Sequence, residues 1–509
     1  MGNSILTALD ERTPMATEVA SPIVAIEAGQ VRGVWRGDPG AADRSAAFLG
    51  IPFAQPPVGA LRFGAPVPPE PWEGIRDAVE HGATAQRGDP GETLIPEPSI
   101  PGRSTLNVDV FTPAPGDPDA ALPVVAWIHG GAFISGSPAS PWYDGRAFNR
   151  DGVVTVSISY RLGFDGFGHV PGAPSNRGVR DWLAALEWIQ RNIAAFGGDP
   201  ARVTLAGQSA GGGAVLTLLG MPAAQHLFSS AWAMSAALSD LTQDDAERTS
   251  RRLAQLAGVP HTRAGFASLT ERQIRDQQQI AARPKTRDRL AALRATLQGA
   301  LRIGPVIDGD LITRPTIASI AAGVGADKPL VIGSTDDEFT FVTDSYEKRV
   351  RLIPSALALA VVGMPLRRLR GYLADNRPQR RLGPAALLGH YASDMIFRST
   401  VVRVAKARAA APTWVYRFSW PSPARRWALH CLDVPFWFDC LAEAHVPALA
   451  GDHPPQRLAD ALHGAAVAQA VAHDPGWAAW SAAPGTTRVF DAEGPDVLPD
   501  GYRNVRALV

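Results

Sequence analysis

The stretch that decides the fold is Val203-Thr204-Leu205-Ala206-Gly207-Gln208-Ser209-Ala210-Gly211-Gly212-Gly213. In it an apolar run leads into the pattern Gly-x-Ser-x-Gly, and a run of small residues follows. Glycine two positions before and after a serine permits a sharp turn from a strand into a helix, where a larger side chain would meet the neighbouring backbone. Such a turn holds the hydroxyl of Ser209 clear of its surroundings. The alternative interpretation is a flexible glycine-rich turn without chemistry.

The apolar runs on both sides of this stretch predict a parallel sheet. Runs typical of buried strands occur at residues 123–129, 153–160, 203–206, 231–234, 329–333 and 413–418. Before the third of them, residues 181–193 carry apolar side chains at helical spacing. Alternating strands and helices are typical of α/β folds. We therefore predict an α/β protein with a large, mostly parallel central sheet and helical insertions, one of them at about 240–299.

The remaining segments fit one domain. Residues 1–20 lack periodicity and predict a flexible tail, whereas residues 23–26 and 30–35 predict an antiparallel hairpin. The prolines of residues 48–57 favour an ordered loop over a strand, and residues 82–101 read as a surface excursion. No linker, composition shift or internal repeat divides residues 21–509, so we expect a single domain.

Composition narrows the choice of partners. The 509 residues include 49 basic and 49 acidic side chains, so no net field favours nucleic acid. A small neutral substrate fits better, with the protein acting as a monomer or homodimer. No apolar run is long enough to span a bilayer, and residues 1–22 lack the apolar core of a secretory signal.

The cysteines point to a reducing compartment. Cys431 and Cys440 cannot form the disulfide framework of a small secreted domain, so a cytoplasmic location is expected. Their spacing fits no structural zinc pattern, and we interpret them as buried thiols. No metal or cofactor is expected.

Acyl transfer by a serine needs a base, an acid that orients the base, and amides that bind the oxyanion. In the α/β-hydrolase fold these lie at strand ends in the chain order serine, acid, histidine. Three carboxylates follow the strand at 329–333, namely Asp336, Asp337 and Glu338, and chemistry alone does not choose among them. For the base, His430 precedes an apolar aromatic stretch and follows the acid. The weaker alternatives are His445, His453 and His463.

Backbone amides and aromatic side chains complete the predicted site. Gly131 and Ala132 follow the strand at 123–129, and Ala210 follows the nucleophile, so their N–H groups are candidates for the oxyanion hole. Aromatic residues near the predicted site suggest an apolar pocket, although core packing explains such residues as well. The candidate pocket residues are Phe133, Phe339, Trp437 and Phe438.

Taken together, these residues resemble the type-B carboxylesterases, a family that includes cholinesterases and bacterial para-nitrobenzyl esterases. The resemblance covers nearly the whole chain. It rests on Phe48–Pro57 with Leu61–Phe63, His129–Phe133, Arg191–Pro200, the Ser209 stretch, Gly304–Asp310, Asp337–Glu338, and His430 with Pro435-Phe436. It implies the α/β-hydrolase fold, hydrolysis of carboxylic esters through an acyl-enzyme, and the triad Ser209, His430 and Glu338.

The chain departs from the family pattern beside each triad member. Gln208 replaces the usual Glu before the nucleophile, Phe339 the Gly after the acid, and Cys431 the Gly after the histidine. Arg103-Ser104-Thr105 replaces a segment that carries a disulfide cysteine in relatives, which implies a cytoplasmic bacterial member. Ser235 aligns with a serine that helps support the acid in relatives.

Two further details bear on substrate and function. No tryptophan lies in residues 82–101 to form a choline-binding face, which argues against choline esters. Hydrolysis of carbamates, amides or lactones uses the same machinery and stays open. A non-catalytic binding module on the same fold is the alternative of a different class, and the intact triad argues against it.

Overall fold

The computed structural model describes residues 20–38, 40–41, 43–85, 93–283, 294, 301–493 and 496–509. The tail predicted at 1–20 therefore lies almost entirely outside the described residues. The same holds for residues 86–92 of the predicted excursion and for residues 284–293 and 295–300 of the predicted helical insertion.

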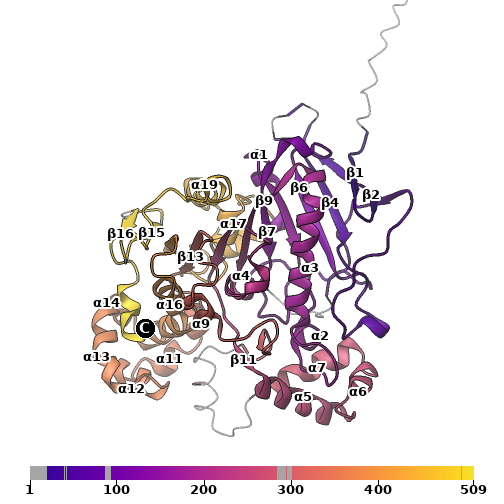
Figure 1. The fold of residues 1–509 in the computed structure, drawn as a ribbon. Helices are drawn as coiled ribbons and strands as arrows, with labels where there is room; N and C mark the ends of the chain where they lie inside the picture. Colours follow the sequence, from indigo (N-terminus) through magenta and orange to yellow (C-terminus); the bar gives the residue numbers. More distant parts are fainter. Residues whose placement is uncertain are drawn as a thin grey trace, which may run out of the picture.

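Within the described residues, eleven strands form one central sheet (Figure 1). Their order is β16 (Val497–Leu498), β15 (Thr487–Phe490), β14 (Thr413–Phe418), β13 (Leu330–Thr335), β10 (Ser230–Met234), β9 (Gly198–Gln208), β7 (Leu122–Ile128), β8 (Val154–Ile158), β6 (Asn107–Thr112), β4 (Ser45–Pro52) and β3 (Val34–Arg36). All pairings from β15 through β14, β13, β10, β9 and β7 to β8 are parallel. The pairings at the two edges are antiparallel. The prediction of a large, mostly parallel sheet is confirmed.

The amino-terminal part partly corrects the sequence analysis. The predicted hairpin exists as β1 (Ile23–Ile26) and β2 (Gly29–Arg32), which form a small sheet with β5 (Ile75–Asp77). The prediction of a loop from residue 48 is wrong, because β4 continues to Pro52. Pro52 is the last residue of that strand, and a bulge interrupts its pairing between Phe48 and Ile51, so the proline disturbs little of the ladder.

Helices surround the sheet, and two groups lie away from it (Figure 1). The first group is α5 (Gln243–Ala257), α6 (Arg263–Ala267) and α7 (Glu271–Ala282), which form the described part of the predicted insertion. The second is α11 (Glu347–Val350), α12 (Ser355–Val361), α13 (Leu366–Asp375) and α14 (Arg377–Arg381). Those nearer the sheet include α1 (Arg146–Arg150), α2 (Gly163–Phe167), α3 (Arg177–Asn192), α4 (Ala210–Leu219), α9 (Thr316–Ala321), α10 (Thr340–Asp344), α15 (Pro384–Ser393), α16 (Ser399–Ala407), α17 (Val434–Trp437), α18 (Val446–Ala450) and α19 (Gln456–Ala472).

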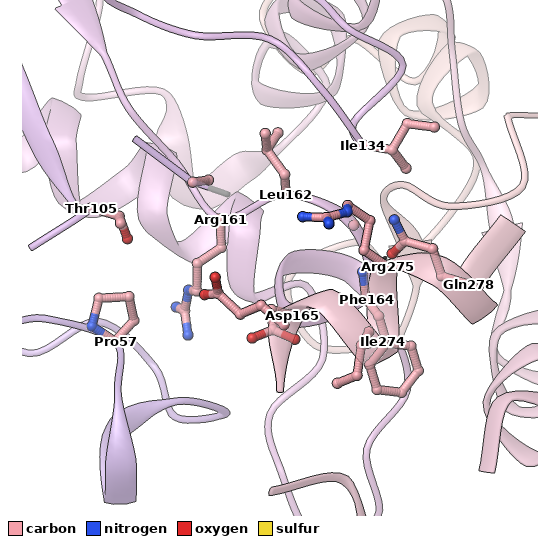
Figure 2. Close-up of a pocket in the computed structure, with 13 residues that line it drawn as sticks. Pro57, Thr105, Ile134, Arg161, Leu162, Phe164, Asp165, Ile274, Arg275 and Gln278 are labelled. Atoms are coloured by element: carbon pink, nitrogen blue, oxygen red, sulfur yellow. Dashed lines mark hydrogen bonds between the residues drawn. The ribbon is translucent and has the colours of Figure 1, made fainter. Parts of the chain in front are cut away.

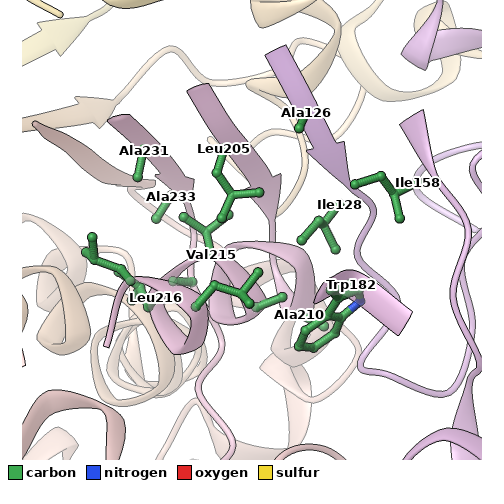
Figure 3. Close-up of a cluster of buried hydrophobic side chains, with 14 of the residues drawn as sticks. Ala126, Ile128, Ile158, Trp182, Leu205, Ala210, Val215, Leu216, Ala231 and Ala233 are labelled. Atoms are coloured by element: carbon green, nitrogen blue, oxygen red, sulfur yellow. The ribbon is translucent and has the colours of Figure 1, made fainter. Parts of the chain in front are cut away.

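Helix α4 packs tightly on the centre of the sheet (Figure 3). Val215 and Leu216 face Leu205 of β9 and the alanines of β10, and all of these side chains are buried. The close approach depends on glycine, because a Cβ on Gly212 would lie 2.6 Å from the carbonyl oxygen of Met234. The helix that follows Ser209 is thus fixed to the strands on which the site is built.

Candidate active site

Ser209 occupies a strained turn between β9 and α4. Its backbone has φ 59° and ψ −120°, a conformation that non-glycine residues rarely adopt. The flanking glycines are sterically required, since a Cβ on Gly207 would lie 2.6 Å from backbone atoms of Gly211, and a Cβ on Gly211 would lie 2.0 Å from the carbonyl oxygen of Ile128. Ser209 keeps partial exposure although Gln208 and Ala210 are buried. The turn therefore presents the hydroxyl as the sequence pattern predicts.

His430 lies between Ser209 and Glu338. Its Nε2 is 3.0 Å from Ser209 Oγ, and its Nδ1 is hydrogen-bonded to Glu338 Oε2. The backbone joins the pair as well, because the N–H of His430 donates to the carbonyl of Glu338 at 2.9 Å. The other carboxylate oxygen, Oε1, accepts the N–H of Thr335 at 3.0 Å. With Nδ1–H donated to the carboxylate, Nε2 is the unprotonated nitrogen that can accept the serine proton.

The two other carboxylates of the loop have different partners. Asp336 pairs with two arginines. Arg417 Nε lies 2.8 Å from Asp336 Oδ1, and a guanidinium nitrogen of the buried Arg398 lies 3.4 Å from the same oxygen. Asp337 accepts from Thr340 Oγ1 at 3.0 Å and is 2.9 Å from His390 Nδ1. Of the three candidates, Glu338 is the one that contacts His430.

The alternative histidines do not approach Ser209. Nδ1 of His463 lies 2.9 Å from the carbonyl oxygen of Trp437, and its Nε2 lies 3.0 Å from Asp151 Oδ2. Both ring nitrogens therefore have hydrogen-bond partners away from Ser209. His445 and His453 are exposed. The structure therefore brings together the three residues that the family resemblance implies.

Burial and charge act in opposite directions on His430. Burial by itself lowers the pKa of His430, but Cys431 and the Glu338 carboxylate favour the imidazolium more strongly, and the pKa is raised well above its ordinary value of 6.5. Burial also raises the pKa of the Cys431 thiol, which keeps that group neutral near pH 7. We therefore assign the stabilisation of the imidazolium mainly to Glu338.

A second buried carboxylate lies close to this pair. Asp433 accepts a hydrogen bond from Tyr416 Oη at 3.0 Å, while its Oδ1 has no partner among the described residues. Burial and the nearby charge of Glu338 raise the pKa of Asp433 to about 7. The environment of the triad thus includes a carboxyl group that titrates near neutral pH.

The loop after β7 lies against the nucleophile. A Cβ on Gly130 would be 3.1 Å from the Cβ of Ser209. Gly131, Ala132 and Phe133 all have positive φ, at 108°, 53° and 62°. In the described part of the chain, no hydrogen bond uses the N–H of Gly131, Ala132 or Ala210 as donor. Three amides are therefore available next to Ser209 for an oxyanion.

Only one of the four predicted pocket residues lies beside the triad. The ring of Phe339 is 5.2 Å from that of His430, centroid to centroid. Phe397, which sequence reasoning missed, is nearer still, at 4.7 Å. Phe397 lies in a π-helical turn at Asp394–Arg398, a form of helix that often occurs at functional sites. No sequence motif predicts this turn.

The other three aromatic residues belong to the core, which corrects the prediction. Phe133 is fully buried and packs on Phe167 and Trp182. Trp437 and Phe438 are each 1% exposed and pack on one another and on Trp127. Side chains enclosed in this way do not line a solvent-open pocket.

Ser235 lacks the contact that the family resemblance implies, whereas Cys431 is the buried thiol that the sequence predicts. Ser235 Oγ is buried and has no hydrogen-bond partner among the described residues, so it does not support Glu338 by a hydrogen bond here. Cys431 is buried with φ 70°, a value that would suit the glycine it replaces. Both thiols are free, and Cys440 is half-buried.

A hollow near the oxyanion loop is too small for a substrate (Figure 2). Figure 2 shows Ile274, Arg275 and Gln278 of α7 facing Leu162 and Phe164. The side chain of Gln278 accepts the N–H of Phe164 at 2.9 Å. The interior volume is about 40 Å³, far below that of a typical ligand pocket. We therefore do not assign this hollow to substrate.

The described residues contain neither a cluster of metal-ligating side chains nor a helix suited to span a membrane. No group of three or more His, Cys, Asp or Glu side chains in that part of the chain is arranged to hold a metal ion. Among its helices, none is both long and apolar enough to cross a bilayer.

Known proteins resemble this chain in sequence and fold. A model of the carboxylesterase family matches residues 20–450. The para-nitrobenzyl esterase of Bacillus subtilis (strain 168) is 36% identical over 406 residues, which cover 77% of this chain and 78% of the relative. The fumonisin B1 esterase of Sphingopyxis macrogoltabida is 31% identical over 417 residues, covering 78% and 73%. A solved carboxylesterase of Geobacillus stearothermophilus has a TM-score of 0.79 at 30% identity, covering 96% of this chain and 99% of the other.

Proposed function

The chain belongs to the carboxylesterase family and is an ester hydrolase of the serine type, and from this premise we propose that Ser209, His430 and Glu338 are its catalytic triad. The observation that carries the proposal is the hydrogen-bonded line from Glu338 through His430 to Ser209 Oγ, with Nε2 and Oγ 3.0 Å apart. Its geometry matches a nucleophile, a general base and an orienting acid.

In the proposed acylation, Ser209 Oγ attacks the ester carbonyl while His430 Nε2 accepts the hydroxyl proton. The resulting imidazolium is stabilised by Glu338 and then protonates the leaving alcohol as the tetrahedral intermediate collapses. In the proposed deacylation, a water molecule takes the position that the alcohol has left. His430 removes a proton from that water, which attacks the acyl carbonyl, and the proton returns to Ser209 Oγ as the carboxylic acid leaves.

The negative oxygen of each tetrahedral intermediate would be bound by the amides of Gly131, Ala132 and Ala210. Support comes from the position of the loop against Ser209 and from the absence of other acceptors for these amides within the described residues. Amides that are already oriented need no reorganisation when the charge develops, so they stabilise the transition state more than the ground state.

We propose small neutral esters as the substrate class. Phe339 and Phe397 place apolar rings next to His430, which favours an apolar acyl or alcohol group at that position. The net charge of zero gives no general attraction for charged substrates. The name of the Bacillus subtilis relative refers to a para-nitrobenzyl ester, so activated aryl and benzyl esters are suitable first probes.

We further propose that residues 21–509 act as one domain of a cytoplasmic bacterial enzyme. The single sheet that includes both Val34 and Leu498 supports one domain. The free thiols of Cys431 and Cys440 support a reducing compartment. Fractionation of the native host, with the enzyme found in the periplasm or medium, would contradict the location.

A fluorophosphonate probe tests the triad without knowledge of the natural substrate. We expect one mole of probe per mole of enzyme, attached to the peptide that contains Ser209, with loss of hydrolysis in proportion to labelling. Labelling of another serine would contradict the assignment. A series of para-nitrophenyl esters of increasing acyl length, run beside a matched anilide, then defines the substrate and separates esterase from amidase activity.

A further inference from the structure

Helices α11 to α14 lie at one corner of the molecule (Figure 1), and the segment that they form carries several exposed large apolar side chains. Leu352 is 84% exposed and Leu366 is 76% exposed, values that are unusual for leucine in a folded protein. Leu357 and Val361 lie one turn apart on α12 and are also exposed. Tyr346, Ile353 and Leu382 belong to the same segment and are exposed as well.

The same segment is strongly basic. Residues 346–382 contain nine Lys and Arg but only two Asp and Glu, a net charge of +7 in a chain whose total is zero. None of the nine forms an ion pair with any described residue, although ion pairs are common elsewhere in the structure. We call this region the arginine–leucine surface. Its cations are Lys348, Arg349, Arg351, Arg367, Arg368, Arg370, Arg377, Arg380 and Arg381.

The arginine–leucine surface rests on a helix that leads to the active site. Helices α11, α12 and α14 all contact α15. At the end of α15, Ser393 Oγ accepts the N–H of Phe339, and the next turn carries Phe397, whose ring packs on His430. The arginine–leucine surface is therefore carried by the same structural unit that borders the triad.

We propose that the arginine–leucine surface docks the enzyme on an anionic lipid bilayer. Unpaired cations beside protruding leucines are the composition that binds at a lipid interface, where the apolar side chains enter the acyl boundary and the cations meet phosphate groups. A symmetric contact with a second copy fits less well, because it would place two surfaces of charge +7 against each other. The proposal concerns binding alone and stands independently of the catalytic assignment.

Vesicle sedimentation with the full chain tests the proposal. We expect little binding to phosphatidylcholine vesicles and at least about tenfold stronger partitioning when about 30% of the lipid is phosphatidylglycerol. The binding falls by a similar factor when salt is raised from about 0.05 M to about 0.5 M. The double variants Leu352→Ser/Leu366→Ser and Arg367→Gln/Arg370→Gln each lose about tenfold or more of the partitioning.

The matched control is Ile75→Ser/Arg76→Gln, which removes an exposed apolar and an exposed basic side chain from β5. It should bind vesicles like the wild type, and all variants should keep normal hydrolysis of a soluble aryl ester, which shows that they fold. Equal binding of surface variants and wild type would overturn the proposal. So would wild-type binding that is insensitive to phosphatidylglycerol, or a change of oligomeric state in the surface variants without a change in vesicle binding.

Discussion

The side-chain amide of Gln208 lies 3.3 Å from Nε2 of His430, the nitrogen that also faces Ser209 Oγ. The base therefore has a neutral amide as neighbour, at the position where the family pattern has Glu. An amide can donate to neutral imidazole but does not stabilise imidazolium by charge. Gln208 thus favours the form of His430 that accepts a proton.

The substitution Gln208→Glu should move the pH dependence of the enzyme. An ionised carboxylate at this distance raises the pKa of His430 further, so the acid limb of kcat/KM shifts to higher pH by about one unit or more. Steady-state rates on an aryl ester between pH 5 and 10 measure the shift. Gln255→Glu adds the same charge at an exposed site on α5 and should leave the profile unchanged. An unshifted limb in the Gln208 variant would show that Gln208 does not act on His430.

The substitution Glu338→Gln should shift the profile the other way. Because the pKa of His430 is raised in the wild type, kcat/KM should fall as the pH drops through a value above 6.5. Without the carboxylate, that limb moves to lower pH, and kcat falls by about 10³-fold or more because the imidazole loses its orientation. Burial and Glu338 raise the pKa of Asp433 to about 7, so Asp433→Asn is the control for its contribution to the profile. A wild-type limb below pH 6.5 would contradict the assignment.

The same pair affects stability with a defined sign. Since the folded-state pKa of His430 is raised, its interaction with Glu338 contributes fully to the free energy of unfolding below pH of about 6.5. That contribution is lost as the pH rises through the folded-state value. The difference in unfolding free energy between wild type and Glu338→Gln should therefore shrink at alkaline pH.

The oxyanion loop can be tested at Gly131. A Cβ there would lie 2.2 Å from the carbonyl oxygen of Ser135, so Gly131→Ala displaces the loop and its amides. We expect a loss of about 10²- to 10³-fold in kcat with little change in KM, which corresponds to about 3 kcal/mol. Gly172→Ala is the control, because that glycine also has positive φ but no atom within 4 Å of the added Cβ. A near-normal kcat for Gly131→Ala would remove the loop from the mechanism.

The loop that carries Glu338 is anchored by Asp336. Burial by itself raises the pKa of Asp336, but Arg417 and Arg398 hold it well below its ordinary range. Asp336→Asn leaves both cations undercompensated and should lower the free energy of unfolding by about 3 kcal/mol near neutral pH. The loss should disappear as the pH falls and the wild-type carboxylate becomes protonated. Asp327, whose side chain is 70% exposed in its ion pair with Lys328, gives the control, since Asp327→Asn should cost about 0.5 kcal/mol or less in urea denaturation.

Local sequence patterns predicted the parts of the site that lie on continuous strands and turns. The glycines around Ser209 and at Gly130-Gly131 can be recognised in the sequence, because the backbone there leaves no room for a larger side chain. The choice of Glu338 over Asp336 and Asp337 depended on the family resemblance, since the three differ only in which tertiary partner each one meets. Phe397 could not be found locally, because tertiary packing brings its helical turn to His430.

The failed predictions have a similar cause. Trp437 and Phe438 follow His430 closely in sequence, yet their side chains point into the aromatic cluster with Trp127 instead of toward solvent. Aromatic character alone does not distinguish a pocket wall from a core. The prolines of residues 48–57 argue against a strand, yet Pro52 is the last residue of β4 and the antiparallel pairing with β6 tolerates it there.

The most direct test of the catalytic account is the rate of Ser209→Ala on an activated aryl ester, measured beside the wild type under the same conditions. Far-ultraviolet circular dichroism should show an unchanged fold. The account predicts that kcat falls by about 10⁵-fold or more, with only the weak activity that binding and the oxyanion amides provide, and that fluorophosphonate labelling is abolished. Retention of near wild-type turnover by the folded variant would contradict it, because a serine hydrolase whose nucleophile is Ser209 cannot form the acyl-enzyme without that hydroxyl.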